Sequence, residues 1–431
     1  LRKSPGGGVV AFGMFRSSHS PILVDFGNAA VKLLQVGLGD HPQVLAAATI
    51  EFTDSQRAAP LDERLAAVGA ELPETLRSHG FRGNRVVVSP FAQHMLVQHM
   101  GVPATESARA PGYCAMQVAI TLGCDPAGLV VRTTPVCETQ RDGQARVETI
   151  VVAMSREDAM RYVEIFRKCR MQVVGMHGDI SADVHAYDHV NRRMEDAGVT
   201  TMYCDLGYGT TKVAIAHGAQ LVFAKSVSIA GRSFDARLAE CRRISLADAR
   251  ALRIAEGVRP ARAAAPAAAA GSTASPSAAS ADGGFALLRA AEARLAREAQ
   301  DPALATADDR RAGAPAPAMG SALPTRRAAS VAIEVREVLE GLSDELGMCA
   351  RYHAALFRDR RIDRVVFLGG EARDVGLCQA LAASLRLPAK AGDPLARFLA
   401  NGPAPADLPE PDAAHPGWAA ACGLASSPTD L

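Results

Sequence analysis

Short apolar runs alternate with amphipathic segments along most of the chain. Before residue 200, the strand-like runs lie at 22–24, 85–88 and 149–154. The last of these leads into 155–169, which opens with a serine and two acidic residues, a pattern typical of a helix start. Helical spacing returns at 330–357, and the strand expected at Val365–Leu368 precedes a helix that begins near Val375. Alternating strands and helices predict an α/β fold.

Two segments depart from this pattern. Residues 259–326 are rich in Ala, Pro and Ser and cannot bury enough apolar surface to offset the entropy of ordering, so we expect a disordered insertion. Within it, 284–301 has the spacing of a helix. Residues 1–19 are expected to form a disordered leader. The chain opens with Leu1, and our hypothesis is that Met14 is the natural start.

One hairpin pattern occurs twice. Residues 22–36 read ILVDFGNAAVKLLQV and residues 202–216 read MYCDLGYGTTKVAIA. Each copy is an apolar strand that ends in Asp-x-Gly, followed by a short turn, a lysine seven residues after the aspartate, and a second apolar strand. Each continues into a further predicted strand, at 44–52 and at 220–227. A single Asp-x-Gly turn carries little information, but two copies with matched spacing indicate a duplicated fold.

The residue types in these turns suit phosphate binding. Glycine lets the backbone approach phosphate oxygens, and successive backbone N–H groups form an anion-binding concavity. Asp25 and Asp205 are expected to face each other across a cleft and to hold Mg²⁺ through its water ligands. The other expected nucleotide-binding residues of the turns are Gly27, Asn28, Lys32, Gly207, Gly209, Thr210 and Thr211.

A third element follows near the C-terminus. The strand expected at Val365–Leu368 runs into Gly369 and Gly370, and Glu371 comes next. Paired glycines at the end of a strand permit close approach of a flat ligand, here an adenine ring. These three residues complete the expected nucleotide site.

Composition narrows the possible functions. The 431 residues include 47 Lys and Arg against 46 Asp and Glu, a net charge of +1 that argues against general nucleic-acid binding. No apolar run reaches the length of a membrane span. The nine cysteines form no CxxC pair, and an odd number argues against a complete disulfide framework.

Together these passages resemble the actin, sugar kinase and heat-shock chaperone ATPase superfamily. Within it the chain is most similar to PilM-type proteins of type IV pilus assembly, relatives of the FtsA division proteins. The resemblance covers about 20–258 and 329–425. It is carried by DFGNAAVKLLQV, by the segment 228–254 and by GGEARDVGLCQALAASLRLP. It places Gly231 at a connecting turn beside the nucleotide, and it puts Asn28 where the family favours serine.

The resemblance implies an actin-like, ribonuclease H-like fold. The first lobe would span 20–200 with an inserted subdomain at about 89–174, and the second would span 201–431, interrupted at 259–326. It further implies a cytoplasmic, ATP-binding scaffold. A groove beside the inserted subdomain would receive a cytosolic segment of a PilN-like inner-membrane protein, which would hold the chain at the inner face of that membrane. Any ATPase activity would be slow, and no catalytic residue is assigned.

Two other functions on the same fold stay open. A sugar or small-acid kinase would need an acid in the first lobe, but no Asn-x-x-x-Asp-like element occurs between 90 and 175. A polymerising filament protein would self-associate through contacts that do not close. Of the remaining charged residues, we interpret Asp179 as a loop acid and Arg64 as a charge on a solvated face.

Overall fold

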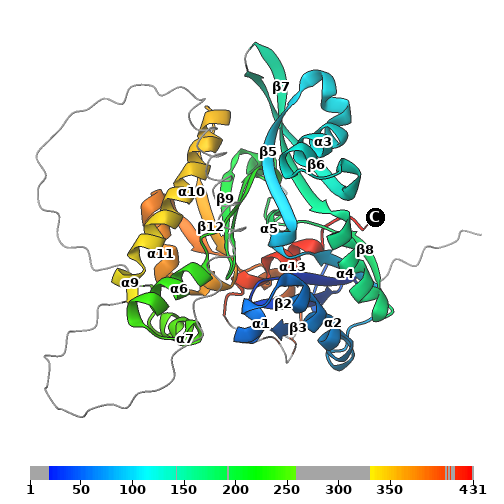
Figure 1. The fold of residues 1–431 in the computed structure, drawn as a ribbon, viewed down its shortest axis with the longest axis vertical. Coiled ribbons are helices and arrows are strands. Elements are labelled where there is room, and N and C mark those ends of the chain that lie inside the picture. Colours follow the sequence, from blue (N-terminus) through cyan, green and yellow to red (C-terminus); the bar gives the residue numbers. More distant parts are fainter. Residues whose placement is uncertain are drawn as a thin grey trace, which may run out of the picture.

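The computed structural model describes residues 19–141, 143–191, 194–258, 331–402, 405, 408 and 413–429. The leader up to residue 18 and the insertion at 259–326, with its expected helix at 284–301, lie outside the described residues. The described chain contains two five-stranded sheets and a separate three-stranded sheet. Figure 1 shows the three-stranded sheet set apart from the two lobes that carry the larger sheets.

The first sheet has the strand order β3-β2-β1-β4-β8. Its first three strands form an antiparallel meander, and β4 and β8 then add parallel to β1. Helices α2 and α4 contact each other beside this sheet. The bounds are β1 (Ile22–Phe26), β2 (Ala30–Val36), β3 (Val44–Glu51), β4 (Arg85–Ser89), β8 (Gln172–Met176), α1 (Asp54–Ala58), α2 (Leu61–Ser78) and α4 (Arg156–Lys168).

The second sheet repeats this topology with the order β11-β10-β9-β12-β13. Again three strands form an antiparallel meander and two more add in parallel. The sequence repeat is therefore a repeat of structure. The bounds are β9 (Thr200–Leu206), β10 (Thr211–His217), β11 (Gln220–Val227), β12 (Arg364–Leu368), β13 (Ala389–Ala391), α6 (Gly231–Arg242), α7 (Leu246–Glu256), α9 (Val331–Glu334), α10 (Arg336–Leu356), α11 (Val375–Leu385) and α12 (Ala396–Leu399).

Local sequence signals explain several of these boundaries. The helix predicted after the strand at 149–154 is α4, and its N-cap Ser155 accepts a hydrogen bond from the backbone amide of Asp158 at 2.9 Å. Helix α11 begins at Val375 as predicted, capped by the side chain of Asp374. The central strands β1, β2, β9 and β10 are almost wholly buried, in keeping with their continuous apolar sequences.

The third sheet, in the order β5-β7-β6, forms the inserted part of the first lobe. It consists of β5 (Met95–Pro103), β6 (Leu129–Arg141) and β7 (Gln144–Ser155), with α3 (Ala110–Leu122) packed against it. The predicted subdomain range of 89–174 also contains α4 and β8, which pack with the first lobe. The remaining short helices are η1 (Ala92–His94), η2 (Ala104–Arg109), η3 (Pro126–Gly128), η4 (Met194–Gly198), η6 (Gly370–Arg373) and η7 (Pro416–Trp418).

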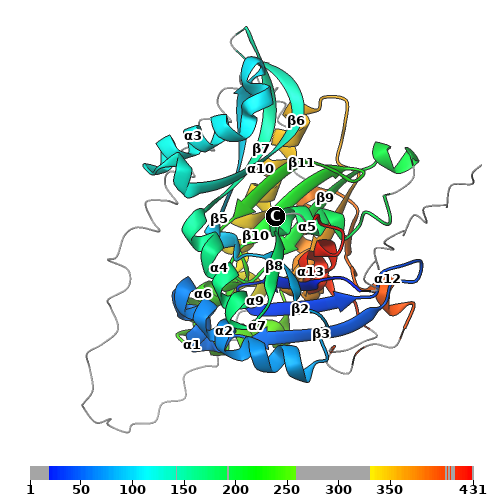
Figure 2. The same cartoon turned by 90° about the vertical axis from the view of Figure 1, so that its right-hand side faces the viewer.

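A buried polar junction fastens this inserted sheet to the second lobe. The hydroxyl of Tyr352 on α10 donates to Oε1 of Glu148 on β7 at 2.6 Å, and Nδ1 of His99 on β5 lies 3.3 Å from the same oxygen. Nε2 of His99 accepts the backbone N–H of Ala224 on β11 at 3.2 Å, and its ring stacks on Phe223. Strand β5 thus runs beside β11 of the other lobe (Figure 2).

Two short helices cross at the centre of the molecule, where the chain passes between the lobes. Helix α5 (Asp179–His185) follows the last strand of the first sheet, and α13 (Ala419–Leu424) packs against α5 and against the first sheet (Figure 1). At the crossing, a Cβ on Gly423 would lie 1.7 Å from the carbonyl oxygen of Ala182. Only glycine permits this approach of the two backbones.

Candidate functional site

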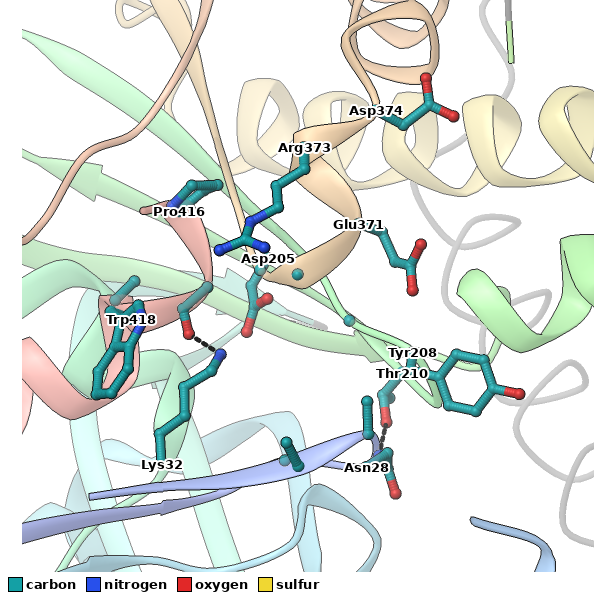
Figure 3. Close-up of a pocket in the computed structure, with 18 of the residues that line it drawn as sticks. Asn28, Lys32, Asp205, Tyr208, Thr210, Glu371, Arg373, Asp374, Pro416 and Trp418 are labelled. Atoms are coloured by element: carbon teal, nitrogen blue, oxygen red, sulfur yellow. Dashed lines mark hydrogen bonds between the residues drawn. The ribbon is translucent and has the colours of Figure 1, made fainter. Parts of the chain in front are cut away.

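A cleft of about 580 Å³ lies between the lobes, and both predicted turns contribute to its lining. Asp25 and Asp205 line the same cleft, as the duplicated hairpins predict. At its mouth the two turns touch, because the side-chain amide of Asn28 donates to the hydroxyl of Thr210 at 3.4 Å (Figure 3). Two strand-turn-strand units from different lobes therefore converge on one space.

The sheet register explains why each turn presents an acid and a base together. Asp25 is paired directly with Lys32 across the first hairpin, and Asp205 with Lys212 across the second. Directly paired residues on antiparallel strands project on the same face of a sheet. The seven-residue spacing in the sequence is thus the spacing of a cross-strand pair.

Each lysine also reaches the segment that opens a crossing helix. Nζ of Lys32 donates to the carbonyl oxygen of Gly417, just before α13, and lies 5.9 Å from the ring of Trp418 (Figure 3). Nζ of Lys212 lies 2.8 Å from Oδ2 of Asp179, the first residue of α5, and 2.5 Å from Oδ2 of Asp205. Each lysine thus contacts the start of the helix that packs against its own sheet, α13 for Lys32 and α5 for Lys212.

Burial perturbs the titratable groups of the cleft. Burial raises the pKa of Asp25 to about 6 from its ordinary value of 3.8. Burial, together with the nearby charge of Asp205, raises the pKa of Asp183 well above its ordinary value. Burial lowers the pKa of Lys32. Burial alone would also lower the pKa of Lys212, but the surrounding carboxylates hold it well above its ordinary value.

The far end of the cleft is built on the Gly369–Gly370 turn. Gly369 has a φ of 85°, and a Cβ there would lie 2.1 Å from Oδ1 of Asp205, so the position requires glycine. Next to it, the carboxylate of Glu371 accepts a hydrogen bond from Arg253 at 2.7 Å. Arg253 also donates to Asp235 at 2.5 Å, and this pair is fully buried.

A second arginine, Arg250, lies at the same end of the cleft. The guanidinium of Arg250 lies 4.4 Å from the ring centre of Tyr208, a cation–π contact between α7 and the second turn. Tyr208, Ile254 and Glu371 line this end of the cleft, and an aromatic and apolar pair beside a carboxylate suits an aromatic ring with polar edges.

Most residues expected at the nucleotide site line the cleft, and three do not. Those in the lining are Asp25, Gly27, Asn28, Lys32, Asp205, Gly207, Thr210, Gly369, Gly370 and Glu371. Of the other three, Gly209 packs against Asn28, where a Cβ would lie 2.6 Å from its Cγ. The Thr211 hydroxyl donates to the carbonyl of Ile229 at 2.7 Å. Gly231 packs against the side chain of Glu371. These three residues therefore support the cleft without lining it.

Two interpretations of charged residues were wrong. Asp179 is not a loop acid but the buried first residue of α5, and Asp183 lies one turn further along the same helix in the cleft. The Asp-x-x-x-Asp spacing shortly after the apolar run at 173–176 is a signal that could have indicated both. Arg64 is buried as well, because its guanidinium packs over Phe91 and donates to Oδ1 of Asn28 at 3.0 Å.

The carboxylates offer the oxygen ligands that Mg²⁺ prefers, but the pairing around them does not fit an ion well. Among the described residues, no group of three or more His, Cys, Asp or Glu side chains is arranged to hold a metal ion. The Oδ2 atoms of Asp179 and Asp205 are already engaged by the ammonium group of Lys212.

A second, apolar groove of about 260 Å³ lies between the inserted sheet and α4. Its lining includes Met95, Val152, Met154, Met160 and Met176, and two arginines, Arg132 and Arg156, also contribute. Met160 is 56% exposed and lies in this lining. No helix in the described ranges combines the length and apolar character needed to cross a membrane.

Comparisons with known proteins establish the fold. No protein-family model matches the sequence, and no curated protein matches it. Among solved structures, one of a PilM–PilN type IV pilus biogenesis complex is similar with a TM-score of 0.63 and 16% identity, covering 94% of this chain and 98% of that one. EutJ, an ethanolamine utilization protein from Carboxydothermus hydrogenoformans, covers 96% of this chain and 91% of its own, at 11% identity and a TM-score of 0.45. MreB5 of Spiroplasma citri covers 88% and 94% of the two chains at 12% identity and a TM-score of 0.43. The predicted actin-like, duplicated two-lobed fold is confirmed.

Proposed function

We propose that the chain is an ATP-binding scaffold of a type IV pilus or related secretion machine. The interlobe cleft holds the nucleotide, and the apolar groove receives a cytosolic segment of a PilN-like inner-membrane protein. That partner would bring the chain to the inner face of the membrane. The observation that carries the proposal is the convergence of the two turns on one cleft.

The cleft has the parts needed for a nucleoside triphosphate. The glycines at 27 and 207 let backbone amides approach phosphates, and the turn at Gly369–Gly370 leaves room for the base and sugar. Arg250 and Tyr208 offer a wall for a purine ring. If the nucleotide arrives with Mg²⁺, Asp25 and Asp205 are the residues that would contact its waters.

The acids of the cleft favour retention of ATP over rapid hydrolysis. A general base must be unprotonated and free to accept a proton from water. Asp179 is paired with Lys212, and the raised pKa of Asp183 favours its protonated form. Neither is well placed as a base, so we expect ATP to act mainly as a structural ligand.

The groove supports the second half of the proposal. Four methionines line it, and methionine side chains adapt to apolar ligands of varied shape. The arginines at its edge would favour a segment that carries acidic residues beside its apolar anchors. Its position between the inserted sheet and α4 matches the groove implied by the family resemblance.

Equilibrium binding of fluorescent ATP tests the nucleotide site. We expect Asp25→Ala and Asp205→Ala to change the affinity by tenfold or more, an effect of about 1.4 kcal/mol. Asp40→Ala, which removes an exposed acid far from the cleft, serves as the control. Equal affinities in all variants would refute the nucleotide site. Phosphorylation of a sugar panel by the purified protein would instead refute the scaffold.

Two exposed methionines allow a matched test of the groove. Met160 lines the groove and Met116 lies on α3 outside it, with exposed fractions of 56% and 57%. We expect Met160→Glu to abolish binding of a synthetic peptide of the PilN-like cytosolic segment, and Met116→Glu to leave it unchanged. If both variants bind the peptide as the wild type does, the groove is not its site.

A further inference from the structure

Lys212 occupies an unusual position among the cleft residues. Its side chain is 12% exposed, and its ammonium group lies between two carboxylates that are themselves at most 10% exposed. One of them, Asp205, belongs to the same hairpin, whereas Asp179 opens the helix that crosses from the first lobe. The lysine therefore bridges two acids from separate elements, β9 and α5, and α5 packs against the second sheet.

The equivalent lysine of the first hairpin does not do this. Lys32 has the same register position relative to Asp25, yet its ammonium group donates to the carbonyl oxygen of Gly417. The duplicated hairpins thus share a lysine but use it differently. Only the second one forms close ion pairs with the acids of the cleft.

The charge of the cleft makes this difference important. Four buried aspartates, at 25, 179, 183 and 205, surround the space between the turns. A triphosphate brought into such a site would be repelled unless a cation offsets the acids, and in phosphate-transferring proteins that cation is commonly Mg²⁺. Here a positive charge is already present, and the raised pKa of Lys212 shows that the acids keep it protonated.

We propose that Lys212 takes the place of the divalent cation by neutralising Asp179 and Asp205 from within the protein, so that the cleft binds ATP without Mg²⁺. The inference rests on the proposed nucleotide-binding function. A hydrated ion held between Asp179 and Asp205 would compete with the ammonium group for their Oδ2 atoms. The lysine and the ion are therefore alternatives.

Titrations of fluorescent ATP in excess EDTA and in Mg²⁺ test this directly. For the wild type we expect dissociation constants within about threefold of each other in the two buffers. For Lys212→Met, which keeps an unbranched side chain without charge, we expect binding in EDTA to be at least about tenfold weaker than in Mg²⁺.

Lys225 provides the matched control. It lies on the neighbouring strand β11, is 17% exposed and pairs with Glu345 at 3.0 Å outside the cleft. Lys225→Met should therefore bind ATP like the wild type in both buffers. A second readout needs no nucleotide: Mn²⁺ followed by electron paramagnetic resonance should bind to Lys212→Met and not to the wild type.

The outcomes separate this inference from the proposed function. A wild type that binds ATP in Mg²⁺ but not in EDTA overturns the role of Lys212 and leaves the nucleotide site intact. A wild type that binds Mn²⁺ stoichiometrically in the cleft overturns it too. Absence of ATP binding in both buffers overturns the nucleotide site and this inference together. The wild-type measurements alone test the role of Lys212, even if Lys212→Met does not fold.

Discussion

Replacing Arg253 by methionine should destabilise the protein strongly, although the arginine lies outside both turns. Its side chain is 1% exposed and joins two carboxylates from separate segments, Asp235 on α6 and Glu371 after the glycine pair. Methionine fills a similar volume but leaves both acids without their main partner. Burial already raises the pKa of Asp235, so the loss would add to an existing cost.

The size of the effect follows from burial. Removing one partner of a buried ion pair typically costs about 3–5 kcal/mol, because a charge is left uncompensated. Arg250 lies 3.5 Å from Glu371 and 3.9 Å from Asp235, longer than the contacts of Arg253 at 2.7 and 2.5 Å, so it can offset only part of the loss. Arg250 is also 20% exposed. We therefore expect Arg250→Met to cost about 1 kcal/mol or less.

Urea unfolding followed by circular dichroism would measure both variants. Because the orphaned acids can take up protons, the destabilisation by Arg253→Met should shrink between pH 8 and pH 5. The variant should also bind ATP more weakly, since Glu371 borders the cleft. Equal unfolding free energies for Arg253→Met and Arg250→Met would refute the argument from burial.

Two further predictions concern Asp25 in the cleft and the attachment of the inserted sheet. Asp25 has a pKa of about 6 in the folded protein against an ordinary 3.8, so the folded state binds the extra proton and stability falls as pH rises from 4 to 6. Asp25→Asn should remove about 3 kcal/mol of this decline, and parallel stability curves for variant and wild type would contradict it. Tyr352→Phe removes the hydrogen bond to buried Glu148 and should cost about 1.5–3 kcal/mol. It should also speed hydrogen exchange in β5, and unchanged exchange there would show that this contact does not hold the inserted sheet.

The hairpins could be predicted because their signals are local. An apolar strand, an Asp-x-Gly turn and a second strand follow one another within about fifteen residues, and the matched copies support each other. The start of α11 at Val375 is also encoded locally, by the capping aspartate before it.

The residues that were missed depend on contacts between distant segments. In the sequence, Arg253 has the pattern of an ordinary polar residue on an amphipathic helix. Only the fold brings Glu371, 118 positions away, into contact with it. Arg64 is buried because Phe91 and Asn28 meet it from other elements. Asp179 gains its partner Lys212 only when α5 packs against β10.

The close crossing at Gly423 and Ala182 has a mechanical consequence. Where two backbones touch without intervening side chains, the helices act as a pivot, and the lobes can change their angle more easily than their separation. Ala182 lies between Asp179 and Asp183, so both acids are next to the pivot and a change of angle would displace them little. The contact between Asn28 and Thr210 lies away from this pivot, so a change in the lobe angle would alter the distance between the two turns. That distance would determine when a large ligand can enter or leave the cleft.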